Sequence, residues 1–189
     1  MKVLGISGSP RKNGNTEILL REALQAAEHM GCETKTFHMS GKTVAPCHAC
    51  GGCFKAGNCV TQDDMQELYA LMAWGDAIIW ATPVYFGDVT AQLKCAMDRT
   101  FAMLQKRSLK GKVAGVLTVT RRVGAVQTKS LLNSFCIVHG MIVAGGAIGY
   151  GREPGDVLTG VGGGINMTAM EEAHLLGKNV VGLTQRLAG

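Results

Sequence analysis

Residues 3–16 read Val3-Leu4-Gly5-Ile6-Ser7-Gly8-Ser9-Pro10-Arg11-Lys12-Asn13-Gly14-Asn15-Thr16. The apolar run 3–7 predicts a buried strand, and the segment 15–30 carries apolar residues at helical spacing. A strand, a short glycine-containing loop and a helix in this order begin a βα unit. The opening of the chain therefore predicts an α/β protein whose first loop follows a strand and leads into a helix.

The same alternation of strands and helices continues to the end of the chain. Further strands are predicted at 33–38, 77–81, 113–118 and 142–148, and helices from 63, and over 90–104, 124–139 and 166–187. Five strands joined in this way fit a flavodoxin-like doubly wound parallel sheet of order 2-1-3-4-5, with helices on both faces. The polar strand 33–38 is expected at an edge and the apolar strand 77–81 at the centre.

We expect a single domain over residues 1–189, with a cysteine-rich loop at 43–61 and a helical extension at 150–189. In a doubly wound sheet, ligands bind beyond the carboxyl ends of the strands. The loops that follow the strands, the cysteine-rich loop included, are therefore expected to share that one edge.

Composition limits the classes of function. Hydrophobic residues make up 47% of the 189 residues and charged residues 17%, which is typical of a globular protein. The formal charge of +5 is spread along the chain, which argues against nucleic-acid binding and is compatible with an acidic protein partner. No signal peptide and no run of eighteen apolar residues are visible, so we expect a cytoplasmic protein without a membrane span.

Four of the seven cysteines lie close together in the sequence, with the spacing C-x2-C-x2-C-x5-C: Cys47, Cys50, Cys53 and Cys59. In a reducing compartment such clusters bind metal more often than they form disulfides. A [4Fe–4S] cluster best fits two x2 gaps followed by a local fourth sulfur. Structural zinc, with His48 as a substitute ligand, and a thiol–disulfide switch between Cys50 and Cys53 are the alternatives.

The loop after the first strand is a candidate phosphate site. Backbone N–H groups and the positive end of a helix dipole favour an anion there. The side chains that we expect to contribute are Ser9, Arg11, Asn15 and Thr16. The loop is not a P-loop, because Asn15 stands where the phosphate-binding lysine would be.

Two further loops could hold a flat ring. Residues 82–88 follow the third strand and offer backbone N–H groups and aromatic surface from Pro83, Val84, Tyr85, Phe86 and Gly87. The alternative for Tyr85 and Phe86 is packing onto the core. Residues 118–124 follow the fourth strand, and Thr120 with Arg121 would approach such a ring, although the sequence does not distinguish Arg121 from Arg122.

These motifs resemble those of the NADPH-dependent FMN reductase family, and within it the iron–sulfur flavoproteins of anaerobic archaea and bacteria. The residues that carry the resemblance are 5–11, 14–16, 47–59, 63–65 and 82–86, and beyond Thr120 it is only general. The resemblance implies FMN held at its phosphate by the residues of the first loop and along its ring by 83–87, and a [4Fe–4S] cluster on the four cysteines.

The resemblance also implies a role and an assembly. Such proteins pass electrons from ferredoxin to oxidants such as dioxygen and peroxide, and form homodimers or homotetramers in which cluster and flavin of neighbouring subunits lie close. Two other hypotheses stay open. One is an NAD(P)H-dependent FMN or quinone reductase without a cluster, and the other is a cysteine-based redox-sensing or binding module.

Overall fold

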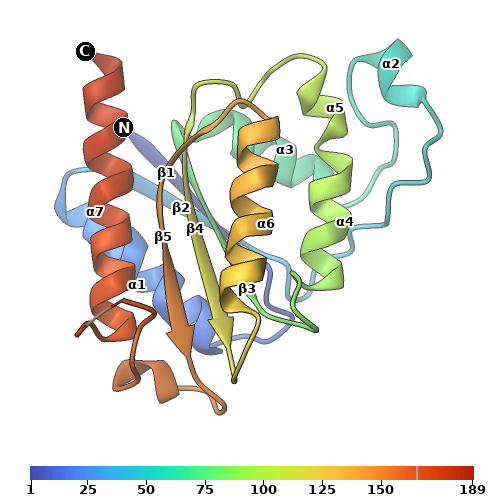
Figure 1. Ribbon diagram of the computed structural model, residues 1–189. Helices are drawn as coiled ribbons and strands as arrows, with labels where there is room; N and C mark the ends of the chain where they lie inside the picture. Colours follow the sequence, from blue (N-terminus) through green and yellow to red (C-terminus); the bar gives the residue numbers. More distant parts are fainter. Residues whose placement is uncertain (165) are drawn as a thin grey trace.

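A computed structural model describes residues 1–164 and 166–189. Its centre is one parallel sheet, in which β1 (Lys2–Ser7) pairs with β2 (Glu33–His38) and with β3 (Ala77–Pro83). β4 (Val113–Thr120) and β5 (Ile142–Tyr150) complete the sheet, whose order is β2-β1-β3-β4-β5 (Figure 1). The predicted fold and strand order are confirmed.

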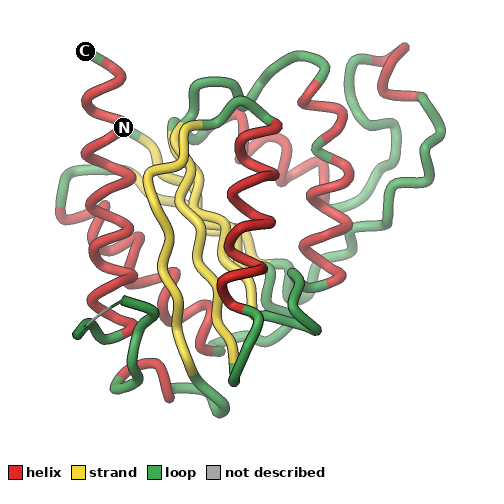
Figure 2. Tube along the Cα trace, in the orientation of Figure 1, coloured by secondary structure: helices red, strands yellow, loops and turns green. Residues whose placement is uncertain are grey.

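Helices cover both faces of the sheet (Figures 1 and 2). α1 (Asn15–His29) and α7 (Ala169–Ala188) pack on one face, and α3 (Met65–Trp74), α4 (Ala91–Arg99) and α6 (Ala125–Val138) on the other. Because successive side chains of a strand point to opposite faces, β1, β3, β4 and β5 contribute to both layers of the core, whereas β2 contributes only Phe37. The sheet is thereby buried on both sides, as parallel sheets require.

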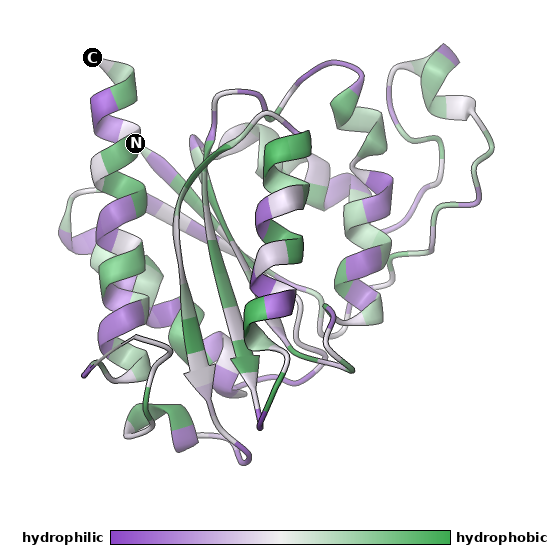
Figure 3. Ribbon diagram, viewed as in Figure 1, coloured by the Kyte–Doolittle hydropathy of each residue, from purple (hydrophilic) through white to green (hydrophobic). Residues whose placement is uncertain are grey.

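The burial of the strands follows their position in the sheet. The central strand β3 is buried along residues 77–82, and β4 is buried throughout, whereas the edge strand β2 is largely exposed. α7 turns apolar residues toward the sheet and carries polar residues elsewhere on its surface (Figure 3). α6 also buries apolar residues, but it leaves Val126, Ile137 and Val138 exposed. None of the described helices is both long and apolar enough to cross a membrane.

Two predicted helices differ from those observed. The segment 90–104 divides at Thr100 into α4 and α5 (Phe101–Leu104), since the Thr100 hydroxyl donates a hydrogen bond of 2.6 Å to the carbonyl oxygen of Met97. The last helix begins at Ala169 rather than at 166, because Thr168 and Glu171 form a reciprocal capping box. A short helix, α2 (Gly52–Ala56), lies within the cysteine-rich loop, and a 3-10 turn, η1 (Asp156–Leu158), follows β5.

The expectation that the cysteines lie at the carboxyl edge of the sheet is wrong. The loop leaves that edge after β2, but its cysteine-bearing part packs beside the C-terminal end of α4 and against α5, at the opposite edge (Figure 1). The physical reason is Arg99, the last residue of α4, whose buried guanidinium donates hydrogen bonds to the backbone of the loop.

Candidate functional site

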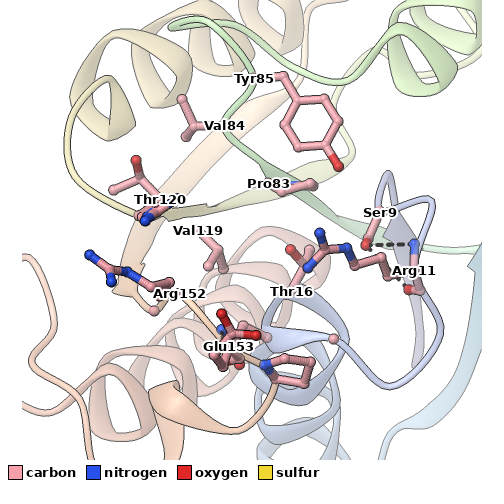
Figure 4. Close-up of a pocket in the computed structure, with 15 residues that line it drawn as sticks. Ser9, Arg11, Thr16, Pro83, Val84, Tyr85, Val119, Thr120, Arg152 and Glu153 are labelled. Atoms are coloured by element: carbon pink, nitrogen blue, oxygen red, sulfur yellow. Dashed lines mark hydrogen bonds between the residues drawn. The ribbon is translucent and has the colours of Figure 1, made fainter.

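A pocket of ≈ 380 Å³ opens beyond the carboxyl ends of the strands (Figure 4). Its walls come from the loops after β1, β3, β4 and β5. The residues that line it are Ser9, Arg11, Gly14, Asn15, Thr16, Pro83, Val84, Tyr85, Val119, Thr120, Arg121, Gly151, Arg152, Glu153 and Pro154. Nine of the predicted site residues are therefore brought together in one pocket.

The loop after β1 forms the polar end of this pocket. The Ser9 hydroxyl accepts a hydrogen bond from the Arg11 backbone N–H at 3.1 Å and lies 3.2 Å from the Arg11 carbonyl oxygen, so it holds the turn in shape (Figure 4). Gly14 caps α1 without a side-chain hydrogen bond. The N–H groups of the first turn of α1 are thus available to an anion, which the helix dipole favours.

Asn15 is held from the other side of the pocket. Its Nδ2 atom donates to the Glu153 carbonyl oxygen at 2.8 Å, and its Oδ1 atom accepts from the Gly155 backbone N–H at 2.7 Å. A Cβ on Gly151 would collide with this amide. The amide expected to face a phosphate therefore mainly fixes the loop after β5, and one of its two N–H groups remains.

The loop 151–156 is the part of the site that the sequence analysis missed. It brings Gly151, Arg152, Glu153 and Pro154 to the pocket. The Asp156 carboxylate accepts from the backbone N–H groups of Arg152 at 2.7 Å and Glu153 at 2.8 Å, and these bonds lower the pKa of Asp156. Its position after β5 was a usable signal, because every loop at this edge can reach the ligand.

Fewer residues of the loop after β3 line the pocket than the sequence predicted. Tyr85 and Asp88 are joined by two backbone hydrogen bonds of 2.9 and 3.0 Å, which close a two-residue turn with positive φ at Phe86 and Gly87. Tyr85 lines the pocket, whereas Phe86 is fully exposed at the tip of the turn. Neither Phe86 nor Gly87 lines the pocket, and Phe86 does not pack onto the core.

The two adjacent arginines after β4 are now distinguished. Arg121 lines the pocket and Arg122 does not. The Thr120 hydroxyl donates to the Val123 carbonyl oxygen at 2.7 Å, which bends the loop back on itself. Three arginines and one glutamate line the pocket, so its electrostatic potential favours an anionic ligand.

A second cavity, of ≈ 430 Å³, lies at the C-terminal end of α4. All four clustered cysteines line it, together with His48, Arg99 and the aromatic rings of Phe54 and Phe101. Those rings meet edge to face with centroids 5.6 Å apart. Among residues 1–164 and 166–189, no three cysteine, histidine, aspartate or glutamate side chains converge as metal ligands.

The environment of Cys59 suits a thiolate. Burial acts to raise the pKa of this thiol, but the backbone N–H of Thr61 and the guanidinium of Arg99 outweigh it and lower the pKa. Cys53 accepts a weak hydrogen bond from the Gln105 amide at 3.4 Å. Four sulfur atoms around one cavity are a donor set that fits an iron–sulfur cluster.

Comparison with known proteins agrees with this geometry. Residues 1–153 match the family model described as NADPH-dependent FMN reductase. An iron–sulfur flavoprotein of Methanocaldococcus jannaschii is 40% identical over 95% of both chains. An iron–sulfur flavoprotein of Methanosarcina thermophila is 45% identical over 77% of this chain and 78% of its own.

The chain belongs to the iron–sulfur flavoproteins of the NADPH-dependent FMN reductase family.

This iron–sulfur flavoprotein is thereby a flavin-dependent redox protein. Its fold is shared with more distant solved structures. A flavone reductase superposes with a TM-score of 0.76 at 19% identity, covering all of this chain and 64% of its own. An archaeal flavodoxin gives a TM-score of 0.63 at 12% identity, covering 98% of this chain and 99% of its own. At such identities the likeness shows the fold alone.

Proposed function

We propose that this flavoprotein binds FMN in the pocket at the carboxyl edge and a [4Fe–4S] cluster in the cysteine cavity, and passes electrons from a ferredoxin-like donor to an acceptor such as dioxygen or peroxide. The observation that carries the proposal is that one chain holds both sites: an arginine-lined pocket at a helix N-terminus and a separate cavity lined by all four cysteines.

The proposal that the pocket binds FMN rests on the difference between its two ends, one polar and one lined by apolar and aromatic side chains. Arg11, Thr16 and the N–H groups at the start of α1 would hold the phosphate, with the turn kept in shape by Ser9 and the adjoining loop by Asn15. Pro83, Val84 and Tyr85 would lie along the ring, with Thr120, Arg121 and the newly found Arg152 on its other side. A cation there stabilises the negative charge of a reduced flavin.

The cysteine cavity supports a cluster through its donors. Cys47, Cys50, Cys53 and Cys59 would hold it, and α2 places Cys53 in a helical turn between the outer ligands. When bound, the cluster supplies one-electron exchange and FMN supplies exchange of one or two electrons. The chain's own residues bind and orient these groups and limit their exposure to water.

A low-potential electron carrier is the donor that we propose. Around the cysteine cavity, Phe54 and Phe101 are exposed apolar side chains, and Lys55, Lys106 and Arg107 are exposed cations nearby in the chain. Apolar contact surrounded by positive charge suits a small acidic protein such as a ferredoxin, because opposite charges steer the encounter.

A homodimer or homotetramer is part of the same proposal. Within one chain the two sites share no lining residue, and only the cysteine cavity is lined by residues of α4. A second copy of the chain could bring its flavin pocket against the cysteine cavity of the first. Sedimentation velocity of the loaded protein tests this assembly.

The experiment that tests the function is the content of FMN, iron, sulfide and zinc in protein purified without oxygen, with its absorption spectrum. We expect one FMN, four irons and four sulfides per chain, and reduction of the flavin by reduced ferredoxin. Zinc in place of iron, or neither metal, would contradict the cluster and leave the cysteines as zinc ligands or as a thiol-based redox sensor.

A second candidate is an NAD(P)H-dependent FMN or quinone reductase. The match of residues 1–153 to the reductase family favours it, as does a Bacillus subtilis relative named as a putative NAD(P)H-dependent FMN-containing oxidoreductase, 28% identical over 84% of this chain. Rapid reduction of bound FMN by NADPH in stopped-flow, in protein without iron, would favour this candidate over the first.

A further inference from the structure

The ends of the cysteine-rich loop are joined into a neck. The Thr43 backbone N–H donates to the Asp64 carboxylate at 2.7 Å, and the Asp64 N–H donates back to the Thr43 carbonyl oxygen at 3.1 Å. The Ala45 N–H donates to the Asp63 carboxylate at 2.9 Å. We call residues 43–45 and 61–64 the neck. Cys47 and Cys59 lie two residues beyond it on either side.

The guanidinium of Arg99 lies inside this neck. Its Nη1 atom donates to the Ala45 carbonyl oxygen at 3.3 Å and pairs with the Asp63 carboxylate, and its Nη2 atom donates to the Thr61 carbonyl oxygen at 3.2 Å. The side chain is only 2% exposed. Arg99 therefore holds both segments of the neck, 43–45 and 61–64, at once. A lysine ammonium lacks the planar set of N–H donors that this requires.

The position of Arg99 within α4 is itself fixed. The Tyr69 hydroxyl donates to the Arg99 carbonyl oxygen at 2.6 Å. Arginine stays protonated at any pH of interest, so the buried charge is permanent. A buried charge of this kind is costly unless it is paired, and Asp63 is its ion-pair partner.

Arg99 also reaches the cysteine cavity. It lines the cavity together with Cys59, and the Thr61 carbonyl oxygen to which it donates lies two residues beyond Cys59. The Nε atom is buried with no hydrogen-bond partner among the described residues. A positive charge is thus fixed in the wall of the cavity that the four cysteines line, and its ion pair with Asp63 partly offsets it.

We propose that Arg99 is a positioning residue of the cluster site, which holds Cys47 and Cys59 at the neck and makes a cluster bound there easier to reduce. The inference rests on the proposed cluster. One-electron reduction adds one negative charge, and a fixed positive charge beside a ligand sulfur stabilises that state. Asp63 has the opposite effect, since its carboxylate disfavours the added negative charge.

The test compares three variants of the loaded, anaerobic protein: Arg99→Gln, Asp63→Asn, and Arg186→Gln as a control in which an exposed arginine of α7, outside the cavity, loses the same charge. The reduction equilibrium of the cluster is measured by electron paramagnetic resonance during titration with dithionite and redox mediators. We expect Arg99→Gln to disfavour reduction at least tenfold, which is about 59 mV for a one-electron couple. Asp63→Asn shifts it the opposite way, and Arg186→Gln leaves it unchanged.

Opposite shifts from the two partners are a result that a purely structural role would not give. Equal potentials in the wild type and Arg99→Gln, at equal iron content, would overturn the inference. If Arg99→Gln assembles no cluster, amide hydrogen exchange of residues 46–60 is compared between the variant and wild-type apoproteins. Faster exchange in the variant supports the role of Arg99 in holding the neck, and equal exchange overturns the inference. Absence of iron from the wild type itself would instead refute the proposed function.

Discussion

Asn15 and Glu153 lie 138 residues apart in the chain and are joined by a hydrogen bond of 2.8 Å from the Asn15 side-chain amide to the Glu153 carbonyl oxygen. A second bond, from the Gly155 N–H to the same amide, completes the link. The first turn of α1 and the loop after β5 thereby form one continuous wall of the pocket. The shape of the flavin site depends on this link as well as on direct contacts.

Replacement of Asn15 by alanine is expected to weaken FMN binding and the fold together. Two hydrogen bonds are lost, each worth about 1 kcal/mol. We expect the free energy of unfolding to fall by about 1–3 kcal/mol and the FMN dissociation constant to rise about tenfold. Urea denaturation and fluorescence titration of the apoprotein measure the two effects. Asn179→Ala, on the exposed side of α7, is the control and should change neither.

Arg121 and Arg122 offer a matched pair. Arg121→Gln removes a charge that lines the pocket, whereas Arg122→Gln removes an equally exposed neighbouring charge that does not. We expect Arg121→Gln to raise the FMN dissociation constant about five- to tenfold, corresponding to about 1 kcal/mol. Arg122→Gln should have no effect beyond the general loss of one positive charge. Equal losses in both variants would show that only the net charge of the loop matters.

The sequence was sufficient for the sheet, because hydrophobic periodicity locates the strands and the strand–helix alternation indicates a doubly wound fold, for which few strand orders are common. It was sufficient for most of the pocket too, because loops that follow parallel strands meet at one edge. The loop that leads into Thr16 is the best example, because its place between a strand and a helix was visible in the sequence.

The predictions were wrong for the cysteines and for Phe86, whose positions are set by contacts or turns that the sequence pattern does not show. The cysteines lie at the far end of α4 because buried Arg99 bonds to Ala45 and Thr61, and nothing in the sequence near Cys47 signals that partner. Phe86 does not line the pocket, because it lies in a tight turn whose backbone is in the left-handed region there, with φ of 52°. Local patterns do not specify such contacts, since they depend on how separate elements pack.

The cysteines of the cavity can be separated from the others by substitution. Cys47→Ser is expected to abolish the iron and sulfide content while FMN stays bound, because the two sites share no lining residue. Cys95→Ser, a partly buried cysteine of α4 outside the cavity, should retain both cofactors. Iron and sulfide analysis of anaerobic protein gives the answer. Loss of both cofactors from a folded Cys47→Ser variant would contradict independent sites.

Phe86 occupies a backbone conformation that aromatic residues rarely adopt. Asparagine tolerates it far better, and Asn-Gly is the preferred pair in a two-residue turn of this type. Phe86→Asn should therefore raise the free energy of unfolding by about 1 kcal/mol. Thermal unfolding of the apoprotein measures it, with Val123→Asn as the control: this exposed apolar residue of the next loop does not have a positive φ, so no gain is expected. A loss of stability in Phe86→Asn would show that the ring is covered in solution.

His139 is a buried imidazole held in one tautomer. The single hydrogen of the Thr100 hydroxyl is donated to Met97, so the 2.8 Å contact between Thr100 Oγ1 and His139 Nε2 requires the histidine to donate. The Phe135 ring covers the imidazole edge to face, with centroids 4.8 Å apart. Burial lowers the pKa of His139 below its ordinary value, because the charged form would lose its hydration.

Stability should consequently fall as the pH drops below the ordinary pKa of histidine. In that range the unfolded chain binds a proton at residue 139 and the folded chain does not, so acid favours unfolding, by at most about 1.4 kcal/mol per pH unit. Above the ordinary pKa the full stability is present. His139→Gln keeps a donor for Thr100 and removes the titration, so its unfolding free energy, measured in urea from pH 7.5 to 5, should fall less steeply than that of the wild type. Identical slopes would show that His139 accepts its proton as readily in the folded protein as in the unfolded chain.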